Sequence, residues 1–327
     1  MSRATFFALF VAVVLAACGG SGGDAPAPIE PPVVGSTGLV LTTANAKPAV
    51  RVAYEATMQS VGTGELVGDT GLATSPDGGF SKPRIARSLS GALTRAMQKV
   101  PLGPDTYDCD SLGTTTISGE LASLFTLTIG DRIGVEYMGC DDGLGEVLNG
   151  RIEFLVADFS GDLALGLYLL EMTVTLLDFE VMTATDSVLS NGDSTVSIDT
   201  TGAPLLALGI DGHSLTTVTN SSTTTVSNFV TTQTVDGSVA PEPYTLSASG
   251  TVDSSQLGGV ITYSTPVTFQ GAGAAYPYAG EFLITGADNA SIRLVALDES
   301  TVRIDIDADG DTVVDSTEET TWDDIAL

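Results

Sequence analysis

The chain has 327 residues, of which 12 are Lys or Arg and 41 are Asp or Glu, giving a formal net charge of −29 at pH 7. This acidity excludes a nucleic-acid-binding protein, because phosphate recognition requires basic side chains. With 43% hydrophobic residues, the chain can form a sizeable core. The composition therefore excludes a disordered acidic protein and fits one large domain or two smaller ones.

The N-terminus has the pattern of a cleaved signal peptide over residues 1–17. Arg3 precedes an apolar run that is too short to cross a bilayer comfortably as a mature helix. The run ends in Leu15-Ala16-Ala17-Cys18, which resembles the lipobox of bacterial lipoproteins. The resemblance implies that Cys18 receives a diacylglyceryl group and becomes the first residue of the mature protein. An ordinary signal peptide, with Cys18 unmodified, is the alternative.

Residues 18–38 combine a Gly/Ser stretch with a Pro-rich one and lack the periodicity of a folded element. We interpret them as a tether between the lipid and a folded domain. In Gram-negative lipoproteins, an Asp directly after the lipidated Cys signals retention in the inner membrane, and Gly19 stands at that place here. The resemblance therefore implies an outer-membrane protein that is anchored by its N-terminal lipid, on either the periplasmic or the outer face.

Residues 39–104 form a predicted helical segment with two amphipathic helices. The first extends from Asn45 to Val61, where large apolar residues recur every three or four positions, and Gly62-Thr63-Gly64 is expected to end it. The second extends from about Arg84 to Lys99 and has an apolar ladder opposite a basic side. We favour packing of this second helix on a sheet; binding to a membrane surface is the alternative.

Residues 105–327 are predicted to form an antiparallel β domain, since short Val/Thr/Ile/Phe-rich runs alternate with Gly, Asn and Asp. The lack of helical patterns between these runs excludes a parallel α/β fold. We therefore predict a mainly β (α+β) fold, with two N-terminal helices packed on a large antiparallel meander. The meander forms either a curved open sheet or a partly closed barrel.

Cys109 and Cys140 remain unmodified after lipidation of Cys18. In an oxidising compartment an even pair favours a disulfide, and two buried free thiols are the alternative. A bridge would bring four aspartates close together: Asp108, Asp110, Asp141 and Asp142. We expect their side chains to point apart; a cation between them is the alternative.

Two dipeptides predict tight hairpins within the β domain. Asn191-Gly192 and Asp211-Gly212 suit type I′ turns, because both central residues of that turn need positive φ. The second turn would make Leu205–Ile210 and His213–Thr219 antiparallel partners.

The long apolar run Leu163–Met182 predicts a β-bulge. Its buried face changes phase near Leu176-Leu177, so that Leu177, Phe179 and Val181 continue the face that Met172, Val174 and Leu176 begin. One extra residue in a strand produces such a change of face.

The most specific internal motif is the acidic segment Asp307–Glu318. It resembles an EF-hand calcium loop, in which oxygen atoms bind the ion. The resemblance implies five carboxylates and one backbone carbonyl as ligands, namely those of Asp307, Asp309, Asp311, Val313 (carbonyl), Asp315 and a bidentate Glu318. Carboxylates crowded in one turn repel one another, and a divalent cation is the simplest compensation. We therefore predict a structural Ca²⁺ site; a solvated acidic turn is the alternative.

Two departures from the EF-hand pattern are expected to matter. Thr312 stands where the loop turns with positive φ and Gly is usual, at a cost of about 1–2 kcal/mol. The preceding stretch Ile292–Ile306 alternates like a hairpin with a turn at Asp298-Glu299-Ser300. The loop is therefore expected after a strand instead of a helix, with Thr320–Ile325 as a short cap.

We predict no catalytic residues. The motifs of serine hydrolases, zinc proteases and phosphate-binding loops do not occur in the sequence. His213 is the single His, and we expect it to be exposed at the start of a strand. Carboxylate pairs can always be found among 41 acidic residues, so they do not indicate a glycosidase.

The lipobox, the Thr/Val-rich β body and the acidic loop followed by Thr321-Trp322 together resemble uncharacterised lipoproteins of Gram-negative proteobacteria. We expect a non-catalytic outer-membrane lipoprotein whose calcium-stabilised β domain has a binding or envelope-structural role. A carrier of lipid or another apolar ligand in a curved sheet is the first alternative. An envelope glycan hydrolase is the second. The expected partners are the membrane, through the lipid, and an apolar ligand or envelope component.

Overall fold

The computed structural model describes residues 37–65, 102–123, 127–141, 143, 145–162, 165–219, 221–273 and 275–326. All of them belong to one unit, Ser36–Leu327. The predicted signal peptide (1–17), Cys18 and the predicted helix Arg84–Lys99 lie outside the described residues.

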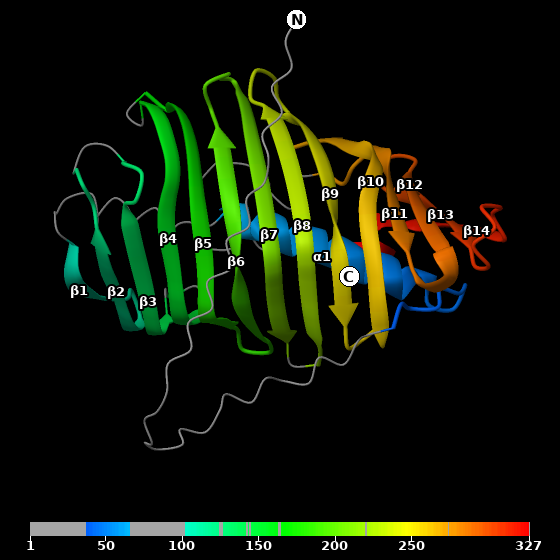
Figure 1. Ribbon diagram of the computed structural model, residues 1–327, viewed down its shortest axis with the longest axis horizontal. Helices are drawn as coiled ribbons and strands as arrows, with labels where there is room; N and C mark the ends of the chain where they lie inside the picture. The colour runs from blue at the N-terminus through cyan, green and yellow to red at the C-terminus, as the bar shows by residue number, and fades with distance from the viewer. Residues whose placement is uncertain are drawn as a thin grey trace, which may run out of the picture. The chain divides into compact units, whose positions relative to one another are not determined.

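Fourteen antiparallel strands form one sheet in which every strand pairs with its neighbours in sequence (Figure 1). The strands are β1 (Leu102–Asp108), β2 (Leu112–Glu120), β3 (Arg132–Asp141), β4 (Val147–Asp162), β5 (Leu167–Met182), β6 (Ser187–Asp199), β7 (Leu205–Thr219), β8 (Thr223–Asp236), β9 (Pro243–Ser254), β10 (Gly259–Ala272), β11 (Ala279–Thr285), β12 (Ser291–Ala296), β13 (Thr301–Asp307) and β14 (Ser316–Thr321). Because β1 and β14 lie at opposite edges, the sheet is open. The predicted antiparallel meander is therefore confirmed. Of its two predicted forms, the structure has the open sheet and not the partly closed barrel. β1 starts slightly before the predicted boundary at Asp105, and an edge strand tolerates Pro104.

The two faces of the sheet differ in chemistry because side chains alternate along each strand. On the inner face, Phe154, Val174 and Val226 are buried. On the outer face, hydroxyl side chains contact one another across strands, as between Thr234 Oγ1 and Thr245 Oγ1 at 2.6 Å. The sheet is therefore a largely one-sided layer: most of its large apolar side chains face one core, and a minority, such as Met138 and Val267, are exposed.

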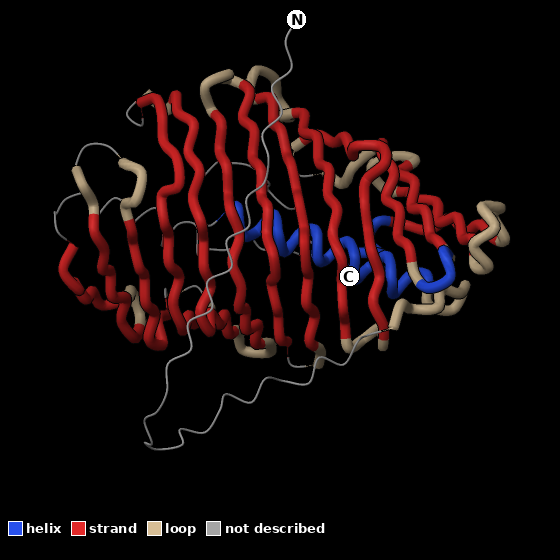
Figure 2. The backbone as a smooth tube through the Cα atoms, in the orientation of Figure 1, coloured by secondary structure: helices blue, strands red, loops and turns tan. Residues whose placement is uncertain are grey.

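Helix α1 (Ala46–Glu65) crosses the inner face and contacts β6 to β12; Figure 2 shows it in blue behind the strands. Its small buried residues, such as Ala49 and Ala53, let the helix lie close to the sheet. The helix confirms the first predicted one but continues through Gly62-Thr63-Gly64. A β-carbon at Gly64 would come within 2.8 Å of Ile210 Cδ1, so this glycine permits close packing and does not end the helix.

A short C-terminal helix, α3 (Trp322–Ala326), packs against α1. The indole of Trp322 is fully buried, stacks on Tyr276 at 5.6 Å and donates its Nε1–H to the carbonyl of Pro277 at 3.0 Å. α3 matches the predicted cap at Thr320–Ile325. Of the two N-terminal helices predicted, the described residues contain α1.

Asn191-Gly192 and Asp211-Gly212 are not hairpin turns. They lie inside β6 and β7, and the proposed partners Leu205–Ile210 and His213–Thr219 form one continuous strand. Gly212 is needed there because a β-carbon would collide with the ring of Phe229 on β8. The glycine reflects a close approach between neighbouring strands and not a reversal of the chain.

The bulge predicted near Leu176-Leu177 is confirmed. The register of β5 against β6 shifts between Leu176 and Phe179, and Asp178 there has a φ of 46°. Asn191 Oδ1 accepts the N–H of Asp178 at 2.7 Å, so this Asn fills the gap in the ladder of backbone hydrogen bonds. Phe179 returns to the inner face, whereas Leu177 remains 42% exposed and does not continue it as predicted.

The bulge of β5 belongs to a row of bulges across the sheet. Register shifts recur at similar heights in β3 against β4, β4 against β5, β6 against β7 and β8 against β9. Asn149 Oδ1 accepts the N–H of Gly139 at 2.8 Å, in the same manner as Asn191 on β6. Bulges increase local twist and bend a sheet, so we attribute the curvature of this sheet to the row.

The predicted disulfide between Cys109 and Cys140 is present, with a Cα–Cα distance of 5.5 Å. It joins the end of β1 to β3. Among the described residues, Asp108, Asp110 and Asp141 do not gather into a group that could hold a metal. Asp142 lies outside the described residues.

Candidate metal centre

The acidic loop connects β13 to β14 and comprises residues 307–315. Its ends are held together because Ile306 pairs with Ser316 in the last rung of the two strands. The predicted hairpin that precedes it is formed by β12 and β13, with Ile292 opposite Ile306. The loop therefore follows a strand, as the alternation of Ile292–Ile306 predicted.

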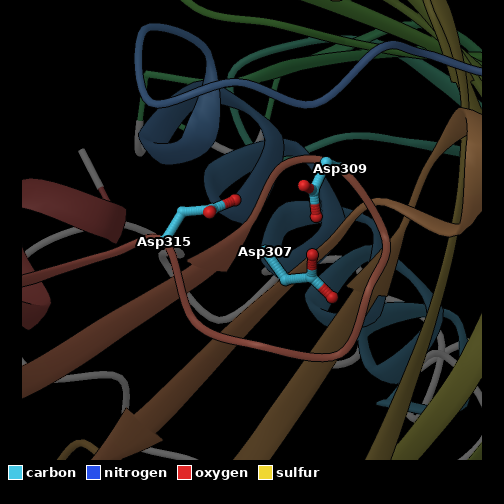
Figure 3. A group of neighbouring side chains, drawn as sticks. All are labelled: Asp307, Asp309 and Asp315. Carbon is cyan, nitrogen blue, oxygen red and sulfur yellow. The ribbon is translucent and has the colours of Figure 1, made fainter.

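Three carboxylates converge in this loop. Oxygen atoms of Asp307, Asp309 and Asp315 all lie within 4.8 Å of one another, and Figure 3 shows the three side chains directed toward a common space. Asp307 is only 7% exposed, whereas Asp309 and Asp315 are exposed. Among the residues that the structure describes, this is the one group of acidic, His or Cys side chains close enough to hold a metal ion.

Backbone N–H groups hold Asp307 and Asp315 in place. Asp307 accepts the N–H of Gly310 at 2.8 Å with Oδ1 and that of Thr312 at 2.8 Å with Oδ2. Asp315 Oδ2 accepts the N–H of Ala308 at 2.8 Å. These donors fix the orientation of two carboxylates, and their partial positive charge offsets only part of the repulsion between them.

Thr312 has a φ of 73°, which confirms the left-handed turn expected at this position. A β-branched residue is strained there. Its N–H bond to the buried Asp307 helps to hold the conformation. The loop thus turns where the EF-hand resemblance places a turn, although the residue is not Gly.

Asp311 and Glu318 do not join the group. Asp311 Oδ1 accepts the N–H of Val313 at 2.8 Å, and Val313 is 62% exposed. Glu318 lies on β14 opposite Ile304, a core residue of the inner face, and it forms an ion pair with Lys47 of α1 at 2.7 Å. Glu318 belongs to the strand β14, which begins at Ser316. Because side chains alternate between the two faces of a strand, Glu318 points to the same face as Ile304 and away from Asp307.

A fourth carboxylate close in sequence, Asp305, already has partners. Arg303 donates to both its oxygens, at 3.0 and 2.9 Å, and Thr317 Oγ1 donates to it at 2.9 Å. The hydrogen bond to Asp305 raises the pKa of Arg303. The carboxylate of Asp305 therefore binds Arg303 and Thr317 on the outer face and does not join the three carboxylates of the acidic loop.

The group of three carboxylates can bind a hard divalent cation, because such ions prefer oxygen ligands and tolerate water in the remaining positions. Sequence reasoning found Asp307, Asp309 and Asp315. It missed the ion pair of Glu318 with Lys47, which depends on the position of α1.

His213 is exposed, as expected, but lies inside β7 and not at the start of a strand. Comparison with protein-family models, curated protein sequences and solved structures found no match for this chain. Within the described residues, none of the helices is both long and apolar enough to cross a membrane.

Proposed function

We propose that this protein is a non-catalytic lipoprotein of the outer membrane whose β domain is stabilised by Ca²⁺ in the acidic loop, with a binding or envelope-structural role. The observation that carries the calcium part is the convergence of Asp307, Asp309 and Asp315 within 4.8 Å. The anchoring part rests on the lipobox residues that end at Cys18.

Calcium in this loop would act on stability and not on chemistry. The ion would remove the repulsion among three carboxylates and fix the connection between β13 and β14. A ligand that binds only the folded state stabilises it by about 2.7 kcal/mol at a concentration of 100 times its Kd. Millimolar calcium outside the cytoplasm would make even a weak site useful.

Calorimetry and thermal unfolding test the calcium site. The mature chain with Cys18→Ser, titrated with CaCl₂, should release or absorb heat and melt at a higher temperature than in chelator. Asp309→Asn and Asp315→Asn should abolish this response. Glu299→Gln, which removes one exposed charge in the neighbouring β12–β13 turn, is the matched control and should retain it.

Glu318→Gln separates the geometry of this loop from that of an EF-hand. Since Glu318 pairs with Lys47, the variant should keep the calcium response. Loss of the response in Glu318→Gln would assign this residue as a ligand. A wild-type protein that gives no heat and no change in melting temperature up to several millimolar CaCl₂ would remove the calcium site.

Metabolic labelling with a palmitate analogue tests the anchor. The wild-type chain should take up the label and fractionate with outer membranes, whereas Cys18→Ser should be unlabelled and released in soluble form. An unlabelled wild-type chain recovered with cytosolic material would contradict the proposed anchor and location.

We retain the second predicted helix, Arg84–Lys99, as part of the proposal on the basis of its apolar periodicity alone. The carrier alternative gains no support from the gap beside Thr63, Leu176 and Phe229, which has no room for a water molecule. No observation favours a glycan hydrolase.

A further inference from the structure

The chain enters the β domain through a short segment, Thr37–Leu41, which we call the strap. Gly38 forms a parallel bridge with Val260 at the start of β10. The N–H of Leu39 donates to the carbonyl of Val260 at 2.9 Å, and the N–H of Val260 donates to the carbonyl of Thr37 at 3.2 Å. Thr37 and Gly38, predicted as tether, therefore belong to the folded domain.

The β11–β12 turn, Ala287–Asn289, holds the strap from the other side. The N–H of Ala287 donates to the carbonyl of Leu39 at 2.8 Å. The fit is tight, because a β-carbon at Gly286 would collide with the carbonyl oxygen of Leu39. The strap thus lies between β10 and this turn, and its last residue, Leu41, is fully buried.

The acidic loop packs against the same turn. A β-carbon at Gly310 would collide with the carbonyl oxygen of Asp288 and lie 3.0 Å from the carbonyl carbon of Asn289. Gly310 has a φ of 74°, and its N–H donates to Asp307 Oδ1. The residue that contacts the turn is therefore positioned by one of the three converging carboxylates.

We propose that the β11–β12 turn couples the acidic loop to the strap, so that cation binding in the loop tightens the joint through which the N-terminal segment enters the β domain. The inference rests on the calcium site proposed above. Binding by Asp307 and Asp309 would fix Gly310, which directly follows Asp309 in sequence, donates its N–H to Asp307 Oδ1 and lies against the carbonyl of Asp288. The turn would then be less able to move away from Leu39.

Asp288 and Asn289 make the turn a suitable transmitting element. Both have left-handed backbones, with φ of 54° and 62°, a conformation that Asp and Asn adopt more readily than other non-Gly residues but that still costs energy in an L residue. The loop on one side and the strap on the other provide contacts that hold this conformation. A change in the acidic loop or in the strap therefore alters the contacts that hold the backbone of Asp288 and Asn289.

Amide hydrogen exchange at Leu39, Val260 and Ala287 measures the joint directly. In the mature chain with Cys18→Ser, CaCl₂ should slow exchange at these three amides by roughly 5-fold or more, the lower end of coupling between sites. Gly310→Ala should abolish this slowing and speed their exchange even in chelator. Amides of β4 and β5, far from the turn, should be unaffected.

Gly166→Ala is the control for Gly310→Ala. Gly166 has a similar φ of 68°, but a β-carbon there meets no atom within 4 Å, so it reproduces the backbone strain without the collision. Gly286→Ala acts from the strap side and should speed exchange at Leu39, with Gly103→Ala, also in open space, as its control. It keeps the test usable if Gly310→Ala does not fold.

The outcomes separate the two proposals. If calorimetry detects no calcium binding, the calcium site fails and with it cation control of the joint. If calcium binds but exchange at the three amides changes neither with CaCl₂ nor in Gly310→Ala, the coupling is overturned while the calcium site stands. If CaCl₂ still slows exchange at the three amides in Gly310→Ala, the coupling does not run through the β11–β12 turn, and the proposal is likewise overturned.

Discussion

At the scale of single residues, Thr312 shows how the acidic loop differs from its closest sequence pattern. Its φ of 73° disfavours a β-branched side chain by about 1–2 kcal/mol. Thr312→Gly would relieve this strain but lose up to about 1 kcal/mol through the greater freedom of the unfolded chain. We therefore expect Thr312→Gly to be neutral or stabilising by up to about 1 kcal/mol in urea unfolding.

Thr317→Gly is the comparison for Thr312→Gly. Thr317 lies in β14, where its backbone needs no glycine and its hydroxyl donates to Asp305. This variant should destabilise by about 1 kcal/mol or more. If both glycine variants destabilise equally, Thr312 is not strained.

Asp298 gives a second prediction at this scale. It accepts the N–H groups of Ser300 and Thr301, each at 2.8 Å. These bonds to the ionised carboxylate, that of Ser300 first, hold the pKa of Asp298 below its ordinary value of 3.8. A lowered folded pKa gives stability that is present above the unfolded pKa and lost as pH falls through the folded one.

Asp298→Asn should therefore lower the urea midpoint at pH 7 and lose this effect at an acidic pH below the lowered pKa of the folded protein, where the wild-type carboxyl is protonated. Glu299→Gln, one residue further in the same turn, controls for the change of charge. An Asp298→Asn effect of equal size at both pH values would show that the hydrogen bonds do not depend on ionisation.

At the scale of elements, the disulfide closes a segment with a sequence separation of 31. The chain-entropy account gives a stabilisation of about 3–4 kcal/mol for a loop of this length. Cys109→Ser with Cys140→Ser should lower the free energy of unfolding by about 2–4 kcal/mol. Urea unfolding with and without reductant checks this, since reductant should affect only the protein that contains the bridge.

Patterns that depend on one element were predictable from the sequence. Spacing within α1 and alternation within β12 and β13 each decide the structure locally, and both predictions are confirmed. The disulfide followed from the number of cysteines. The acidic loop was located because its residues are contiguous, and the conformation of Thr312 followed from its place in the motif.

Patterns that depend on a neighbouring element were not predictable. Asn191-Gly192 and Asp211-Gly212 have the sequence of hairpin turns, but the ring of Phe229 and the bulge at Asp178 need them inside strands. The partner of Glu318 depends on where α1 places Lys47. The coupling of Gly310 to the strap needs three segments that are far apart in the chain.

At the scale of the whole sheet, the edge strands bear directly on self-association. An open sheet has backbone N–H and C=O groups at both edges that can pair with another chain. β14 lies at one edge and carries Glu318 and Glu319, both exposed. Like charges would meet when two such edges pair, so these residues oppose association, assisted by the net charge of −29.

Removing the charge from this edge should therefore expose its tendency to pair. We expect the double variant Glu318→Thr, Glu319→Val to dimerise or aggregate at micromolar concentration, measured by light scattering after size exclusion at physiological salt. Glu318→Gln, Glu319→Lys loses the same two carboxylates but keeps a charge on the strand, so it should remain as dispersed as the wild type. If the two variants associate equally, the loss of net charge, and not the loss of charge from the strand, causes the effect. If both variants remain dispersed, β14 does not need charged residues to stay unpaired at its outer edge.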